Sequence, residues 1–257
     1  MRARGVGIVS SLVVGTGAVL GAQAIYTARR RDLPTVIGAD ASGHEGDPAH
    51  RVVRVAAAGD STLTGPGLDD PGDVWLRQAL RMLADAHQHR FELQSFAAGG
   101  ARMADVVREQ LEPLISSRPD IAVVVVGTND AIRFTPLGDV SASCARLVER
   151  LASEVPNVLI GGVGDLANIA RLRWPLAGAL RLRGRAVDSI IRHTVARHDN
   201  VHYVDVSLAD PDFRRGGASL FAADLFHPNR DGHALWAAIS QVAFEQALRE
   251  RIRANRR

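Results

Sequence analysis

The run Ile121–Val126 constrains the fold more than any other stretch, because every one of its side chains is apolar. Pro119 and Asp120 precede this run and Gly127 follows it, so residues that interrupt regular structure bound it on both sides. A strand that is apolar at consecutive positions must be covered on both faces, which is the situation of a central strand in a parallel sheet. The run therefore predicts an α/β domain with helices on both sides of a sheet.

Strand-like and helix-like patterns alternate on either side of this run. The predicted strands are residues 51–59, 91–96, 121–126, 158–163 and 201–206. Apolar residues at helical spacing predict helices over residues 74–86, 101–116 and 231–250. A kink is expected in the second of these at Pro113. Two more helices are predicted, one through Leu147, Leu151 and Val155 and one in the arginine-rich segment before the last strand. Alternation with short connections predicts a doubly wound parallel sheet of five strands.

The N-terminal segment differs from the remainder of the chain. Arg2 and Arg4 precede an uncharged run, Gly5–Ala28, and three arginines follow it. About 20 apolar residues cross a membrane, so residues 1–31 are predicted to form a hydrophobic helix that acts as an anchor or a signal sequence. An uncleaved anchor, a cleaved signal and a buried helix all remain open. Either of the first two would place the protein in the cell envelope, anchored or exported, rather than in the cytoplasm.

The remaining organisation follows from composition. Residues 32–50 contain several prolines and glycines with little apolar periodicity, and they are predicted to be a linker. The folded domain is predicted over residues 51–250, followed by a basic tail, 251–257.

The high isoelectric point of about 9.9 does not indicate a nucleic-acid-binding protein. Residues 1–31 carry five arginines and no acidic residue, and residues 249–257 carry five arginines and one glutamate. The two ends together carry more positive charge than the formal net charge of +3 of the whole chain, so the region between them has a negative net charge. A phosphate-binding face is therefore not expected on the folded domain.

Polar or glycine-rich clusters follow the ends of three predicted strands and precede the last helix. They are Gly59-Asp60-Ser61, Gly99-Gly100, Gly127-Thr128-Asn129-Asp130 and Asp224-Leu225-Phe226-His227. The carboxyl ends of parallel strands meet at one edge of a sheet, where ligands bind, so these clusters are expected to converge.

Together the clusters supply the groups that hydrolysis of an acyl bond requires. Ser61 is the candidate nucleophile, His227 the base that takes its proton, and Asp224 the carboxylate that orients the imidazole. Gly100 through its backbone N–H, Asn129 through its amide and Ser61 through its own N–H are the candidate donors to the oxyanion. Gly99 competes with Gly100 for this role.

In order and spacing, these four clusters resemble the conserved blocks of the SGNH (GDSL-type) hydrolase family, from about residue 52 to residue 245. The resemblance implies a flavodoxin-like three-layer α/β/α fold, a Ser61–His227–Asp224 triad, and an oxyanion hole formed by Ser61, Gly100 and Asn129. It implies no metal and no organic cofactor. The substrate would be a small-molecule, lipid or glycan ester.

Two rival functions remain open at this stage. The same site could transfer acyl groups to a sugar or lipid hydroxyl, or the domain could be a non-catalytic module that binds lipid or carbohydrate. A dinucleotide-binding domain is disfavoured because no Gly-x-Gly-x-x-Gly follows the first predicted strand. The Gly-x-Ser-x-Gly elbow of the larger α/β-hydrolase fold is also missing.

Two further expectations concern single segments. Leu166–Val187, in which leucines and Trp174 alternate with arginines, is expected to cover the sheet as a helix; the alternatives are that it lines an acyl pocket or rests on a lipid surface. His233, near the start of the last helix, is expected to be exposed.

Overall fold

The computed structural model describes Gln23 and residues 40–254, with the side chains of residues 250–254 left out. The N-terminal hydrophobic helix predicted within residues 1–31 lies outside the described residues, apart from Gln23, as does the end of the basic tail. Within the described part, no helix is both long and apolar enough to span a membrane.

The sheet has six strands in the order β1-β3-β2-β4-β5-β6. The strands are β1 (Gly43–Glu45), β2 (Arg51–Gly59), β3 (His89–Ser95), β4 (Ile121–Val125), β5 (Val158–Gly161) and β6 (Val201–Val204). Strands β2 to β6 pair in parallel, as the sequence predicts. The apolar run that forms β4 lies between β2 and β5, with Ala57 opposite Val123.

Strand β1 corrects the prediction of a purely parallel, five-stranded sheet. It pairs antiparallel with β3 at the sheet edge, with Gly43 opposite Leu93. The strand comes from the stretch that composition indicates as linker, and its three residues show no apolar alternation. Edge strands are short and polar in many proteins, so hydrophobic patterning does not reveal them.

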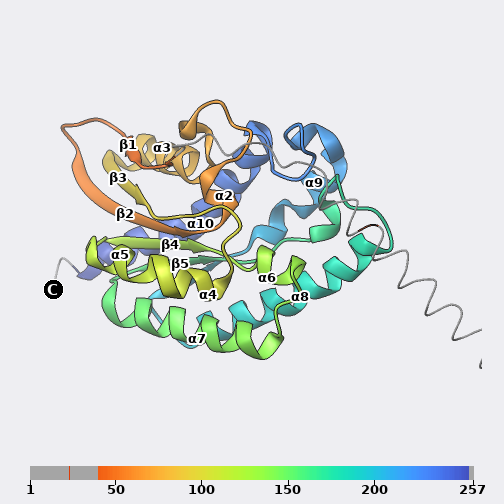
Figure 1. The fold of residues 1–257 in the computed structure, drawn as a ribbon. Coiled ribbons are helices and arrows are strands. Elements are labelled where there is room, and N and C mark those ends of the chain that lie inside the picture. Colours follow the sequence, from red (N-terminus) through yellow and green to blue (C-terminus); the bar gives the residue numbers. More distant parts are fainter. Residues whose placement is uncertain (1–22, 24–39, 255–257) are drawn as a thin grey trace, which may run out of the picture.

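Helices cover both faces of the sheet and give the domain three layers (Figure 1). Helices α3 and α10 pack on one face, while α5, α7 and α8 lie on the other. The helices are α2 (Ser61–Thr64), α3 (Trp75–His87), α4 (Met103–Asp105), α5 (Leu111–Ser116), α6 (Thr128–Ile132), α7 (Leu137–Glu154), α8 (Leu176–Val195), α9 (Asp210–Gly216) and α10 (Arg230–Ala254). Short 3₁₀ turns occupy Pro71–Asp73, Leu166–Asn168, Val206–Ala209 and Gly217–Leu220.

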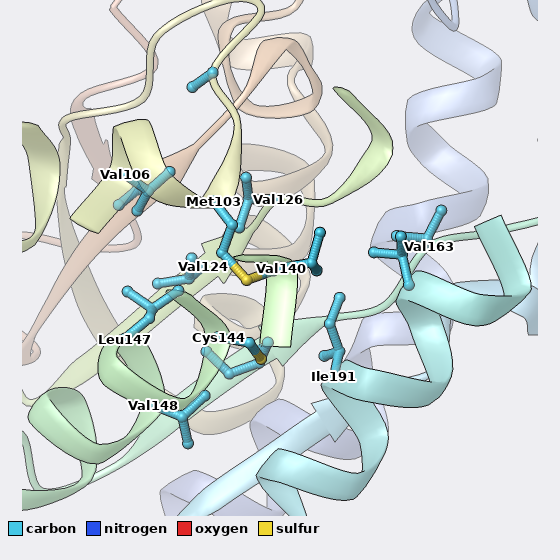
Figure 2. Close-up of a cluster of buried hydrophobic side chains, with 14 of the residues drawn as sticks. Met103, Val106, Val124, Val126, Val140, Cys144, Leu147, Val148, Val163 and Ile191 are labelled. Atoms are coloured by element: carbon cyan, nitrogen blue, oxygen red, sulfur yellow. The ribbon is translucent and has the colours of Figure 1, made fainter. Parts of the chain in front are cut away.

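The core beneath α7 and α8 consists mainly of β-branched and aliphatic side chains (Figure 2). Val124 lies in β4 and Val126 directly follows that strand, while Cys144 and Leu147 belong to α7. All four are at most 2% exposed. The continuous apolar run of β4 is therefore explained by burial on both faces of the sheet.

The helix predicted at residues 101–116 is interrupted before the expected kink at Pro113. A five-residue π-helical turn, Val106–Gln110, separates α4 from α5, and Leu111 N–H donates to the Val106 carbonyl oxygen. Such turns insert one extra residue into a helix and are frequent near functional sites.

The strand order fixes where a site can form. Successive strands β2 and β3 lie side by side, and the chain then crosses to β4 on the other side of β2. This reversal between β2 and β4 is a topological switch point, and ligands bind at the carboxyl ends of the strands there. Helices α2 and α6 begin at this edge, directly after β2 and β4 (Figure 1).

Candidate active site

Ser61 is the first residue of α2, in a sharp turn after β2. Gly59 has a φ of +148°, and a Cβ atom there would lie 2.0 Å from the Val125 carbonyl oxygen, so only glycine fits. Asp60 is the N-cap of α2, and its carboxylate accepts a hydrogen bond from Thr62 N–H at 3.0 Å. The turn thus places the Ser61 hydroxyl at the carboxyl edge of the sheet.

His227 and Asp224 reach Ser61 from the loop that precedes α10. His227 Nε2 lies 3.2 Å from Ser61 Oγ, and His227 Nδ1 lies 2.6 Å from Asp224 Oδ2. The other oxygen, Asp224 Oδ1, accepts from the backbone N–H groups of Phe226 and His227. Asp224 therefore holds both the loop and the imidazole, and the three residues are arranged as a nucleophile, a base and an orienting carboxylate.

The local environment keeps Asp224 ionised. Burial alone would raise the pKa of this carboxyl, but the hydrogen bonds from the His227 ring and from two backbone amides outweigh it and lower the pKa to about 2. A carboxylate at neutral pH favours a proton on His227 Nδ1, which leaves Nε2 free to accept the proton of Ser61.

Asn129, near the start of α6, connects the other two clusters. Its Nδ2 donates to the Ala101 carbonyl oxygen at 3.2 Å and lies 3.4 Å from Asp60 Oδ2. The amide is thereby held between the turn that carries Ser61 and the loop that carries Gly100. Gly100 has a φ of +77°, a left-handed conformation that favours glycine.

Asp60 is buried and links the nucleophile turn to Asn129. Burial is the main influence on this carboxyl and raises its pKa to about 6, although hydrogen bonds from Thr62 oppose the shift. Its contacts with Thr62 N–H and Asn129 Nδ2 tie α2 to α6.

Gln110 is a site residue that the sequence analysis missed. Its Oε1 accepts from Gly59 N–H at 2.7 Å, and its Nε2 donates to the Gly59 carbonyl oxygen at 3.1 Å. Gly59 lies two residues before Ser61, so this buried amide fixes the turn that carries the nucleophile. The π-helical turn Val106–Gln110 brings Gln110 to this position, and a glutamine within a helical pattern gives no sign of it in the sequence.

We expect Gln110→Leu to slow the reaction of Ser61 with a fluorophosphonate by about tenfold and to lower the stability by about 2 kcal/mol, because it leaves a buried Gly59 N–H unpaired and releases the turn. Stopped-flow reaction of Ser61 with a fluorophosphonate measures the first effect, and denaturant unfolding measures the second. Gln241→Leu is the matched control, since the Gln241 amide donates to carbonyl oxygens of Ala79 and Ala237. It should destabilise the fold without slowing Ser61, and an unchanged fluorophosphonate rate in Gln110→Leu would contradict the positioning role.

A largely apolar pocket of about 110 Å³ opens beside Ser61 and His227. It extends under the ends of β5 and β6. Five aromatic side chains line it: Trp75, Phe213, Phe221, Phe226 and Trp236. Neither Gly100 nor Asn129 lines the pocket, so it opens away from the two candidate oxyanion donors.

His233 is buried rather than exposed, which corrects the sequence-based expectation. Its side chain lies in α10, and Nδ1 accepts from Trp75 N–H at 3.2 Å. Burial, and to a lesser extent the charge of His227, lowers its pKa to about 3. The neutral ring therefore caps the start of α3, where the N-cap residue Val74 offers no side-chain acceptor.

Across residues 40–254, no group of three or more His, Cys, Asp or Glu side chains is placed to hold a metal ion.

The fold and site define a class. A mostly parallel, six-stranded sheet with a Ser–His–Asp arrangement at its carboxyl edge is an α/β fold of the hydrolase-like type. Residues 57–235 match the sequence model of the GDSL-like Lipase/Acylhydrolase family, and the chain belongs to that family. The predicted resemblance is confirmed.

Known proteins agree with this assignment. The chain is 29% identical over 202 residues to the GDSL-like esterase Rv1075c of Mycobacterium tuberculosis, a match that covers 78% of this chain and 64% of that protein. The chain thus spans somewhat less than two thirds of the length of this relative.

Solved structures share the fold at low sequence identity. The esterase EstA of Pseudoalteromonas sp. has a TM-score of 0.60 at 16% identity, with 76% of this chain and 98% of that chain covered. TesA has a TM-score of 0.62 at 18% identity, covering 76% and 99%. The acetylxylan esterase Axe2 of Geobacillus stearothermophilus has a TM-score of 0.55 at 21% identity, covering 79% and 95%.

Proposed function

We propose that this protein is a serine esterase that cleaves carboxylic esters through an acyl-enzyme intermediate. The observation that carries the proposal is the continuous contact from Asp224 through His227 to Ser61, with separations of 2.6 Å and 3.2 Å. Membership of a family of lipases and acylhydrolases supports the same reaction class.

In the first half of the reaction, Ser61 Oγ attacks the ester carbonyl carbon while His227 Nε2 takes the hydroxyl proton. Asp224 stabilises the imidazolium that forms. The backbone N–H groups of Ser61 and Gly100 and the Asn129 amide donate to the developing oxyanion. The contact of Asn129 with Asp60 is long at 3.4 Å, so one amide hydrogen can turn to the substrate.

The first half ends when His227 gives its proton to the leaving alcohol and the ester C–O bond breaks, which leaves the acyl group on Ser61 Oγ. In the second half, water loses a proton to His227 and attacks the acyl carbon. His227 then returns that proton to Ser61 Oγ as the bond between Oγ and the acyl carbon breaks, and the acid is released. The aromatic pocket beside Ser61 supports an apolar acyl group as the part of the substrate that it receives.

The proposal extends to the cellular location. The uncharged run Gly5–Ala28 between arginines supports anchoring in, or export across, a membrane. The substrate would then be a small-molecule, lipid or glycan ester in the cell envelope.

The test is covalent labelling of the full chain with a fluorophosphonate, followed by peptide mass spectrometry. We expect a single modified residue, Ser61, and loss of p-nitrophenyl butyrate hydrolysis in proportion to labelling. A chain-length series of esters then reports the acyl preference of the pocket. Hydrolysis that survives complete labelling of Ser61, or labelling confined to another residue, would overturn the proposal.

A second experiment separates hydrolysis from acyl transfer. Free acid should form at the same rate whether or not sugar or lipid hydroxyl acceptors are added. An acylated acceptor as the main product would show that the proposed reaction is acyl transfer and not hydrolysis.

A further inference from the structure

An exposed apolar cluster lies at the N-terminal half of α8, outside the active site. Trp174 is 82% exposed, Leu182 is 67% exposed and Phe134 is 55% exposed. We call these three side chains, together with Arg173, Arg183 and Arg185, the Trp174 surface. Large apolar groups so exposed on a soluble domain indicate a binding surface when they lie together.

Contacts of α8 place all three apolar residues along the N-terminal half of this helix. The Trp174 indole lies beside Gly178, where a Cβ atom would be 3.7 Å from the ring, and Leu182 follows one helical turn later. The Arg183 guanidinium lies over the Phe134 ring at 5.9 Å and donates to the Thr135 carbonyl oxygen. Phe134 follows α6, which packs against α8 (Figure 1).

The sequence segment around Trp174 carries positive charge only, although Arg181 pairs with Asp165 just before it. Leu166–Val187 contains five arginines and no aspartate or glutamate. Arg173 and Arg185 are exposed, and Arg183 is partly exposed. Arginine beside tryptophan and leucine is the composition of segments that rest on anionic membranes, where cations meet headgroups and the indole sits at the interface.

The Trp174 surface adjoins the catalytic loop. Arg171 N–H donates to the Leu225 carbonyl oxygen at 2.8 Å, and the Arg171 guanidinium lies 5.9 Å from the centre of the Phe226 ring. The segment that leads to Trp174 is therefore bonded to the residues between Asp224 and His227.

Gln23, which lies within the described part of the chain, bonds to the backbone at the start of α8. Gln23 Nε2 donates to the Trp174 carbonyl oxygen at 2.9 Å, and Leu176 N–H donates to Gln23 Oε1 at 3.2 Å. Gln23 belongs by sequence to the uncharged run Gly5–Ala28, and its bonds are to backbone groups of Trp174 and Leu176, next to the Trp174 surface.

We propose that the Trp174 surface docks on an anionic lipid bilayer, with Trp174 and Leu182 in the interface and the arginines at the headgroups. Docking there holds the catalytic loop close to the membrane, so esters presented by the bilayer reach Ser61 directly.

The test uses the full chain and the fluorescence of its three tryptophans. Trp75 is buried and Trp236 is partly buried, so Trp174 is the indole accessible to lipid. Vesicles of phosphatidylglycerol carrying brominated acyl chains should quench the emission and shift it to the blue. Vesicles of phosphatidylcholine should do so much less, and Trp174→Phe should abolish the quenching. No quenching, quenching that persists in Trp174→Phe, or equal quenching by both lipids would overturn the proposal.

A matched pair of double variants tests the consequence for substrate. Trp174→Ser/Leu182→Ser should lower hydrolysis of a vesicle-borne ester by about tenfold or more and leave hydrolysis of a soluble ester unchanged. Met82→Ser/Val242→Ser removes exposed apolar groups from α3 and α10, on the opposite layer, and should change neither. Equal losses in both pairs would overturn the proposal. A wild-type chain that hydrolyses no ester would refute the esterase function instead, while the quenching experiment still decides the docking.

Discussion

Replacing Ser61 by alanine is expected to lower kcat/KM for p-nitrophenyl butyrate by at least about 10⁴-fold. In the proposed mechanism the hydroxyl is the group that attacks, and His227 Nε2, 3.2 Å from it, is the base that activates it. What remains in the variant is the oxyanion donors and the pocket, which bind an ester but provide no nucleophile. Initial rates over a substrate series measure the loss.

The fold should survive this change, because the Ser61 side chain is partly exposed and α2 keeps its Asp60 cap. Circular dichroism and thermal unfolding check this point. Ser153→Ala, on the exposed face of α7, is the control and should hydrolyse the ester at the wild-type rate. An alanine variant at position 61 with more than a hundredth of the wild-type rate would require another nucleophile.

The second large effect is expected from Asp224→Asn, which should lower kcat by about 10³- to 10⁴-fold. Asp224 Oδ1 accepts from two backbone amides, so an asparagine oxygen will take that place and its NH₂ will face His227 Nδ1. His227 must then carry its proton on Nε2, the atom that should take the proton of Ser61. Pre-steady-state release of p-nitrophenol measures this step.

The pH dependence of stability gives a separate readout for Asp224. Its folded-state pKa of about 2 lies below the ordinary value of 3.8, so the carboxylate stabilises the fold fully above pH 3.8 and progressively less as the pH falls toward 2. We expect Asp224→Asn to lose about 2 kcal/mol of unfolding free energy at pH 7, with the difference from wild type shrinking over that acidic range. Asp231→Asn, at an exposed carboxylate of α10, should show neither effect. A wild-type rate in Asp224→Asn would remove this residue from the mechanism.

The central sheet could be predicted because burial leaves a strong pattern. The apolar run of β4 and the alternation of β2 to β6 with helices follow from covering a parallel sheet on both faces. Strand β1 could not be predicted, since Gly43-His44-Glu45 carries no apolar face. It pairs with β3 through the backbone, and the buried Glu45 is held by Arg77 and Arg81 of α3, partners that are far away in the sequence. Backbone pairing at a sheet edge has no side-chain requirement that a sequence would display.

The candidate site also contains residues that the sequence reveals and residues that it does not. Ser61, Asp224 and His227 were predictable because the reaction needs those side chains, and the structure brings all three together. Gln110 and His233 instead bind backbone N–H groups, those of Gly59 and Trp75. A backbone N–H leaves no trace in the sequence. Recognising them requires the three-dimensional path of the chain.

The π-helical turn that ends at Gln110 also limits how the chain length can vary. A regular helix over residues 103–116 would lack one residue and would rotate Gln110 by about 100° relative to the residues that follow. The amide would then point away from Gly59, while α5 kept its place over the sheet. Within residues 103–116, a deletion or insertion of a single residue therefore changes the nucleophile turn, even though it falls in a helical segment.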